Sequence, residues 1–321
     1  MVNGIMLGMR RTILVIVTLA LVAVGVWFLA HQGGTPSSAP VLPPMSGTQG
    51  TVLQVVAAEN FWGSLAAQIG GTHVKVFSIV SDPNADPHEY ESSAADARAV
   101  AQADYVIENG AGYDSWMGKL LGAGTNPHRK VLDVAMFLDK HEGDNPHFWY
   151  DPSYVNATAA QIERDLVTLD PADAAYFAAQ YAALTNDLAG YEQRIAAIKA
   201  QFAGTQIAAT EDMVSYLAQA AGLDLISPPA FTQAVAEGND PSAASIVTFQ
   251  EQLRSGKVHV LVYNEQTVTP LTDGMKTLAA QEGIPVVAIT ETIQPPTMSF
   301  EDWMNAEVAA LQHALGGSTN G

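Results

Sequence analysis

The feature that most limits the folds available to this chain is a stretch without strand signals, residues 151–204, lying between two sets of strand-like runs. Asp-Pro occurs twice in it, at Asp151-Pro152 and Asp170-Pro171, and both pairs suit the N-cap and first position of a helix. After the second pair the stretch predicts one long amphipathic helix over residues 171–203, roughly 45 Å long at about 1.5 Å per residue. Its apolar residues recur at intervals of three or four: Phe177, Tyr181, Leu184, Leu188, Tyr191 and Ile195.

Short β-rich runs alternate with helical patterns on both sides of that helix. The first set comprises TVLQVVAAE, HVKVFSIV, DYVIENG and KVLDV, and the second comprises TQIAAT, VHVLVYN and IPVVAIT. Strands that alternate with helices build α/β sheets. We therefore predict an α/β protein with two α/β lobes joined by one long connecting helix. The N-terminal lobe covers residues 51–170, the linking helix 171–203 and the C-terminal lobe 204–317.

The first fifty residues have a different character. Arg10 and Arg11 precede an apolar run from Ile13 to Ala30, which predicts a signal peptide or an N-terminal membrane anchor over residues 1–31. Residues 32–50 are rich in Gly, Pro and Ser and are expected to form a flexible linker. The part from about Thr51 onward is therefore expected to work in the periplasm or elsewhere outside the cytoplasm.

Composition restricts the chemistry of any site. The 321 residues include no cysteine, which excludes disulfides, thiolate zinc sites, catalytic thiols and a lipidated cysteine. The formal net charge of −19 argues against a nucleic-acid partner, because phosphate binding needs clustered Lys and Arg. A metal ion would have to be held by nitrogen and oxygen atoms.

Two histidines follow proline in the first lobe. His88 in DPHEYE and His147 in NPHFWYDP both lie in a loop that proline constrains, and both precede a helical pattern. Such histidines are candidate metal ligands. The alternative interpretation is that His88 is a surface histidine at the start of a helix and that the second Pro-His is a chance duplication.

Two glutamates follow strands of the second lobe. Glu211 comes directly after TQIAAT, and Glu291 comes directly after IPVVAIT. Groups that bind ligands collect beyond the carboxyl ends of strands in α/β sheets. The sequence therefore suggests that two histidines of one lobe and two carboxylates of the other close around a cation in the cleft between the lobes. Alternatively, Glu211 favours the following helix N-terminus and Glu291 is a solvated turn residue.

Three segments resemble the signature regions of the metal-binding solute-binding proteins of ABC transporters, the zinc, manganese and iron family. They are DPHEYESSAADARAVAQADYVIENGAGYDSWM, NPHFWYDPSYVNATAAQIERDLVTLDPADAAYF and ATEDMVSYLAQAAGL. The similarity extends from about Val52 to about Leu315. The resemblance implies that the metal site lies between the two lobes.

The resemblance also implies a ligand set. The first two motifs of the family each supply a histidine, matched here by His88 and His147. The third motif supplies a histidine or a glutamate, matched by Glu211, with the neighbouring Asp212 as the competing choice. The fourth ligand is usually an aspartate, and Glu291 stands at that position as a departure from the family pattern. Outside the motifs, Glu265 is a candidate hydrogen-bond partner for a metal-bound histidine.

The function that the resemblance implies is capture of a divalent transition metal and its delivery to an ABC transporter membrane permease for import. The metal (Zn²⁺ or Mn²⁺, or else Fe²⁺) would be the cargo, the protein would not be an enzyme, and a monomer is expected. Two alternatives stay open: an exported metallohydrolase, against which the lack of HExxH and GxSxG counts, and a metal-binding adhesin or surface protein.

Overall fold

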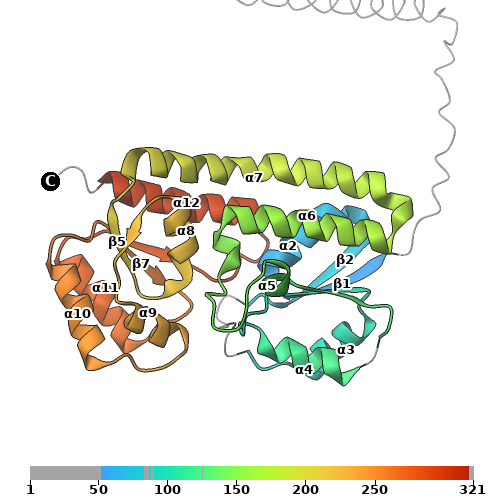
Figure 1. The fold of residues 1–321 in the computed structure, drawn as a ribbon, viewed down its shortest axis with the longest axis horizontal. Helices are drawn as coiled ribbons and strands as arrows, with labels where there is room; N and C mark the ends of the chain where they lie inside the picture. The colour runs from blue at the N-terminus through green and yellow to red at the C-terminus, as the bar shows by residue number, and fades with distance from the viewer. Residues whose placement is uncertain (1–51, 83–86, 88–89, 125, 318–321) are drawn as a thin grey trace, which may run out of the picture. The chain divides into compact units, whose positions relative to one another are not determined.

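The computed structural model describes residues 52–82, Pro87, 90–124 and 126–317. These residues form two parallel four-stranded sheets, ordered β2-β1-β3-β4 and β6-β5-β7-β8 (Figure 1). The strands of the first sheet are β1 (Leu53–Glu59), β2 (Val74–Val80), β3 (Tyr105–Glu108) and β4 (Lys130–Asp133). Those of the second are β5 (Gln206–Ala209), β6 (Asp224–Leu225), β7 (Leu261–Asn264) and β8 (Val286–Ile289). The predicted α/β class with two lobes is confirmed.

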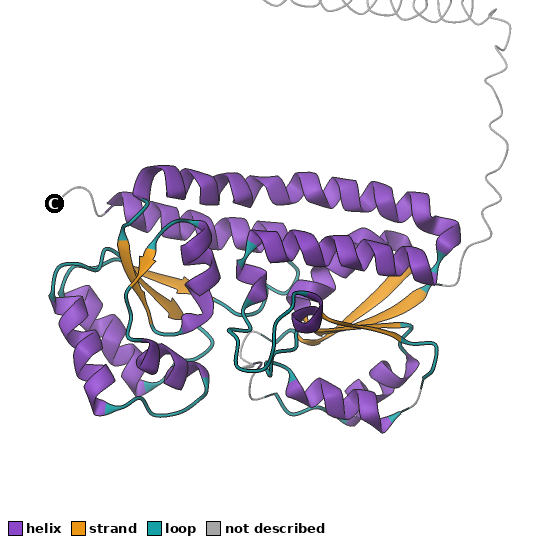
Figure 2. Ribbon diagram, in the orientation of Figure 1, coloured by secondary structure: helices purple, strands orange, loops and turns teal. Residues whose placement is uncertain are grey.

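Helices cover both sheets (Figure 2). Those of the first lobe are α2 (Asn60–Gly70), α3 (Ala94–Gln102), α4 (Ser115–Ala123), α5 (Val134–Phe137) and α6 (Pro152–Leu169). After the connecting helix α7 come α8 (Ser215–Ala220), α9 (Pro229–Ala236), α10 (Ala243–Arg254), α11 (Pro270–Gln281) and α12 (Phe300–Gly317). Short 3₁₀ helices are η1 (Gly71–His73), η3 (Phe148–Tyr150), η4 (Pro171–Asp173) and η5 (Asp212–Val214).

The connecting helix α7 (Ala174–Phe202) has 29 residues and runs along one side of both lobes, beside α6 and α12 (Figure 1). The structure divides the predicted segment, because the 3₁₀ turn η4 precedes α7. Asp151 and Asp170 cap the helices that follow them, and each is followed by proline in the first turn, as predicted. The buried face of α7 consists of Phe177, Leu184, Leu188, Tyr191, Ile195 and Ile198.

One continuous hydrophobic core joins the two lobes under α7. It includes Val55 and Ile107 of the first sheet, Ile207 and Val287 of the second, and Leu188 of α7. Each sheet also has one smaller core on its other face. Because parallel strands are covered on both faces, they are apolar along most of their length, as β1 is. The shared core connects the two lobes through packed side chains as well as through the chain itself.

The sequence did not predict β6, which has only two residues and pairs with the edge of β5 at Gln206 and Ile207. Within the ranges that the structure describes, no helix is both long and apolar enough to cross a membrane. The predicted segments 1–31 and 32–50 lie outside the described residues.

Candidate metal centre

Three of the four predicted ligands lie where the two lobes face each other. His147 directly precedes η3 in the first lobe, Glu211 follows β5, and Glu291 follows β8. All three side chains are buried, with at most 1 % of each residue exposed. The fourth predicted ligand, His88, lies outside the described residues. Residues far apart in the sequence meet here because the carboxyl ends of the strands of both sheets point toward the same cleft.

Asn145 fixes the orientation of the His147 ring. The side-chain oxygen of Asn145 lies 2.7 Å from Nδ1 of His147, and its Nδ2 donates to the backbone oxygen of Asp212 at 2.8 Å. Since the amide nitrogen faces that carbonyl, the amide oxygen faces the imidazole and accepts the Nδ1–H. The other ring nitrogen, Nε2, is then the one with a lone pair for a metal ion. Nε2 lies 3.8 Å from Oε2 of Glu291.

The role that Asn145 takes was expected of Glu265. Glu265 is exposed, whereas Asn264, the last residue of β7, is buried. Asn145 also connects the lobes. Its backbone oxygen accepts the Tyr216 hydroxyl at 2.9 Å, in addition to the bond from its side chain to Asp212. At His147, the hydrogen bond expected of Glu265 is made by Asn145 instead.

Glu291 is held from both lobes. Its Oε2 accepts the hydroxyl of Tyr113 at 2.7 Å, and its Oε1 accepts Nδ2 of Asn264 at 2.5 Å. The backbone N–H of Glu291 donates to the side-chain oxygen of Gln266 at 2.6 Å. These contacts fix both the loop after β8 and the direction of the carboxylate, which faces His147.

Asn264 also distinguishes Glu211 from Asp212. Its Nδ2 donates to Oε2 of Glu211 at 3.2 Å, so one amide at the end of β7 gathers the two glutamates. The carboxylate of Asp212 is 30 % exposed and lies 3.8 Å from Nδ1 of His147, the nitrogen that carries the proton. Burial and the shared contact with Asn264 therefore favour Glu211 over Asp212 as the carboxylate that lies beside Glu291.

Aromatic rings form the apolar side of this centre. Phe61 stacks on Trp149 with ring centroids 4.1 Å apart, and Trp149 meets the His147 ring edge-to-face at 5.2 Å. The ring of Tyr113 lies near those of Trp149 and His147, with centroid distances of 5.1 Å and 6.0 Å. Rings packed in this way keep bulk water away from His147 and hold the imidazole in place.

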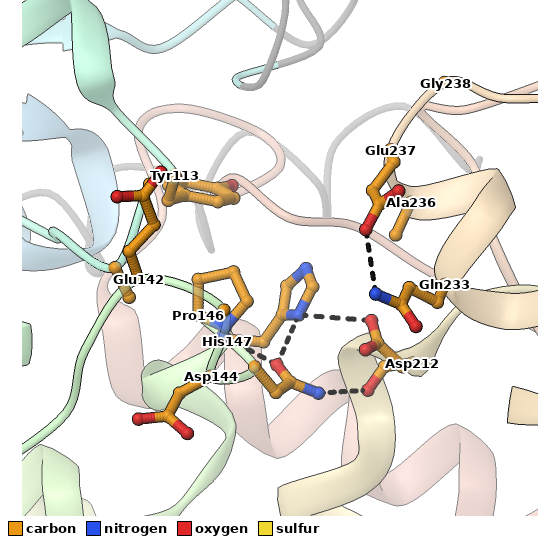
Figure 3. A pocket seen from close by; sticks show the side chains of 14 residues that line it. Tyr113, Glu142, Asp144, Pro146, His147, Asp212, Gln233, Ala236, Glu237 and Gly238 are labelled. Carbon is orange, nitrogen blue, oxygen red and sulfur yellow. Dashed lines mark hydrogen bonds and ion pairs between the residues drawn. The ribbon is translucent and has the colours of Figure 1, made fainter.

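A pocket of about 600 Å³ opens beside these residues, and Tyr113 and His147 are part of its lining. Figure 3 shows His147 near the middle, with Glu142 and Asp144 on one side and Asp212 and Glu237 on the other. The described residues that line the pocket include four carboxylates and neither lysine nor arginine. The mouth of the centre therefore attracts cations and repels anions.

A second group of potential ligands lies elsewhere in the first lobe. One ligand atom from each of His73, Asp170 and Asp173 lies within 4.8 Å of the others, and Nδ1 of His73 is 2.5 Å from Asp173. His73 directly precedes β2, so this group lies at the amino ends of the strands, opposite the cleft. Asp170 already caps η4 through Ala172. We interpret this group as a tie between η1 and η4.

Proteins of similar sequence are named as substrate-binding lipoproteins of metal ABC transporters. The chain is 26% identical over 261 residues to the metal ABC transporter substrate-binding lipoprotein FimA of Streptococcus parasanguinis, covering 76% of this chain and 81% of that protein. It is 26% identical over 256 residues to the manganese ABC transporter substrate-binding lipoprotein PsaA of Streptococcus pneumoniae, covering 74% and 78%.

A solved structure with this fold is the periplasmic zinc-binding protein TroA from Treponema pallidum. Its TM-score is 0.69 at 16% sequence identity, over 83% of this chain and 98% of that one. The sequence pattern of one protein family, described as zinc-uptake complex component A periplasmic (ZnuA), matches residues 55–314. That match omits only the first two residues of β1 and the last three of α12 from the strands and α-helices of the two lobes. It includes His147, Glu211 and Glu291. The chain belongs to the ZnuA family of periplasmic zinc-uptake components.

Proposed function

We propose that this protein captures a divalent transition metal outside the cytoplasm and delivers it to the membrane permease of an ABC transporter for import. The observation that carries the proposal is the meeting of His147 with Glu291 and Glu211 across the cleft. The lone-pair nitrogen of His147 faces Glu291 at 3.8 Å, and a single amide, Asn264, holds both glutamates. We propose His88, which follows β2 in the sequence, as the fourth ligand.

This ligand set suits a cargo ion. Two neutral imidazoles and two carboxylates give a net charge near zero when a divalent cation is bound. Four protein ligands would close around the ion, whereas a catalytic zinc site keeps one position open for water or substrate. We therefore propose a carrier that is not an enzyme. An exported metallohydrolase would instead cleave esters or peptides when loaded with metal, and an adhesin would bind a surface partner without metal.

The donor types admit more than one metal. Imidazole nitrogen suits zinc and iron, and carboxylate oxygen suits manganese. Among the relatives described above, PsaA is named for manganese and TroA for zinc. We propose zinc and manganese as the principal candidates, with iron as the third.

The remaining parts of the proposal concern the rest of the chain. Residues 1–31 act as a signal peptide or membrane anchor, and residues 32–50 act as a flexible linker. Residues 51–170 and 204–317 form the lobes, joined by 171–203, and the protein works as a monomer. Size-exclusion chromatography with mass determination tests both points. It is run on the full chain extracted from membranes and on any soluble form, and it shows where the chain is found and whether it is a monomer.

Metal binding itself is tested by titrating metal-free protein with Zn²⁺ and with Mn²⁺ in a calorimeter. The proposal expects one ion per chain and saturation at a molar ratio of about one. Ester or peptide hydrolysis by the loaded protein would favour the metallohydrolase instead. A protein that binds neither ion would contradict the proposal.

Replacing Glu211 by histidine is expected to shift the preference from manganese toward zinc. The change exchanges a carboxylate for an imidazole and gives a three-histidine set, which is closer to the sites that zinc favours. Competition titrations of both metals measure the shift. Asp212→Ala is the matched control: if it abolishes binding while Glu211→His changes neither affinity, the ligand is Asp212.

Replacing Asn145 by alanine is expected to lower metal affinity by about 10-fold to 100-fold, as loss of a partner that orients a metal-bound histidine commonly does. Asn145→Asp keeps the acceptor for the His147 Nδ1–H and should retain most of the affinity. Nitrogen NMR shifts of the His147 ring report the tautomer directly. Equal losses in both variants, with an unchanged tautomer, would show that Asn145 acts only by joining the lobes.

A further inference from the structure

A fully buried carboxylate at the carboxyl end of an interior strand of the first sheet takes no part in the contacts described so far. Glu59 is the last residue of β1 and the N-cap residue of α2, and its exposed fraction is 0 %. Neither of its carboxylate oxygens has a hydrogen-bond partner among the described residues. A buried ionised carboxylate without a partner is strongly destabilising, so such a group needs either a proton or a nearby cation.

Glu59 lies on the cleft side of the first lobe. It pairs with Val80, the last residue of β2, which precedes His88 by eight positions in the sequence. Its neighbour Asn60 exchanges two hydrogen bonds with Ile293, at 3.2 and 2.9 Å, and so joins this end of β1 to the loop that carries Glu291. Glu59 is thus anchored near the loop that carries Glu291.

The charges that act on Glu59 are all negative. Burial raises its pKa well above the usual value, and Asp114, Glu108 and Glu291 raise it further, against a smaller lowering by the backbone N–H of Glu59 itself. Tyr113, next to Asp114, donates to Glu291, so the Glu59 carboxyl lies close to the hydrogen-bonded side of the metal centre. The cation that the proposed function brings to this centre would supply the compensating positive charge.

We propose that Glu59 is a further carboxylate of the metal site, which contacts the cargo ion from the first lobe. The inference rests on the proposed function and adds an oxygen ligand to it, which takes the net charge of the metal-loaded site from near zero to about −1. With Glu59 the first lobe contributes an oxygen as well as imidazole nitrogen, which makes the site more favourable for a hard cation that takes more than four ligands.

Titration of Zn²⁺ and Mn²⁺ into the full chain and its Glu59→Gln variant tests the inference. We expect Glu59→Gln to lower the affinity for the ion that binds more tightly by about 10-fold or more. The melting temperature of the metal-free variant should equal or exceed that of the wild type, because the neutral amide replaces a buried acid. A residue that only supports the fold would lose melting temperature instead.

Glu108→Gln is the matched control, because Glu108 ends the neighbouring strand β3 and acts on Glu59 through its charge. It should leave the affinity nearly unchanged. Equal losses in both variants, or an unchanged affinity in Glu59→Gln, would overturn the inference while the proposed function stands. If Glu59→Gln does not fold, Glu59→Asp replaces it, with the same loss expected because the shorter side chain withdraws the carboxylate. A wild type that binds neither ion would contradict the proposed function itself.

Discussion

Replacing His147 by alanine is expected to lower the affinity for zinc or manganese by about 100-fold or more. Four protein ligands together account for about 10–16 kcal/mol in structural zinc sites, so one ligand contributes about 3 kcal/mol. His147 is fully buried and its Nε2 faces Glu291, so no water molecule from bulk solvent easily replaces it. Calorimetric titration with a competing chelator measures the loss.

The control for this prediction is His128→Ala, because His128 is exposed and lies outside the cleft. Its affinity should equal that of the wild type. His88→Ala should behave like His147→Ala if His88 supplies the fourth ligand. An unchanged affinity in His147→Ala would remove the residue around which the proposed centre is built.

Stability of the metal-free protein is expected to depend on pH through Glu307. Burial raises the pKa of this residue from 4.5 to about 7, partly offset by hydrogen bonds from Tyr150 and Thr290. Between these two pH values the folded state binds more protons than the unfolded state, so the free energy of unfolding falls as pH rises. The penalty is absent below pH 4.5, complete above pH 7, and amounts to about 3 kcal/mol.

Urea unfolding of the wild type and of Glu307→Gln, at pH 5 and at pH 8, tests this dependence. The variant should gain stability relative to the wild type as pH rises, since its amide does not ionise. Glu282→Gln, at an exposed position, should run parallel to the wild type at both pH values. A constant difference between wild type and Glu307→Gln would show that Glu307 does not titrate in this range.

The two lobes could be predicted from sequence because parallel strands and the helices between them have distinct periodicities. All the predicted strands are present, but β6 is too short to leave a periodic signal. The helix boundary at Asp170 was readable because proline follows a capping residue. The continuous core under α7 could not be read from the sequence, because packing between distant segments leaves no local pattern.

The candidate site could likewise be predicted only in part from the sequence. Glu211 and Glu291 were found because each follows a strand of the second lobe. Glu59 was missed because it is the last residue of β1 rather than a residue after the strand, and a glutamate at that place also suits the following helix N-terminus. Asn145 and Asn264 were missed because an amide gives no signal of its own until its partners are known. Only the fold brings those partners together.

Anomalous X-ray diffraction from crystals of the metal-loaded protein tests most directly whether this cleft holds the cargo. We expect one metal peak in the cleft, about 2.0–2.2 Å from Nε2 of His147 and from carboxylate oxygens of Glu211 and Glu291. A peak between His73, Asp170 and Asp173, with none beside His147, would contradict the proposed metal site.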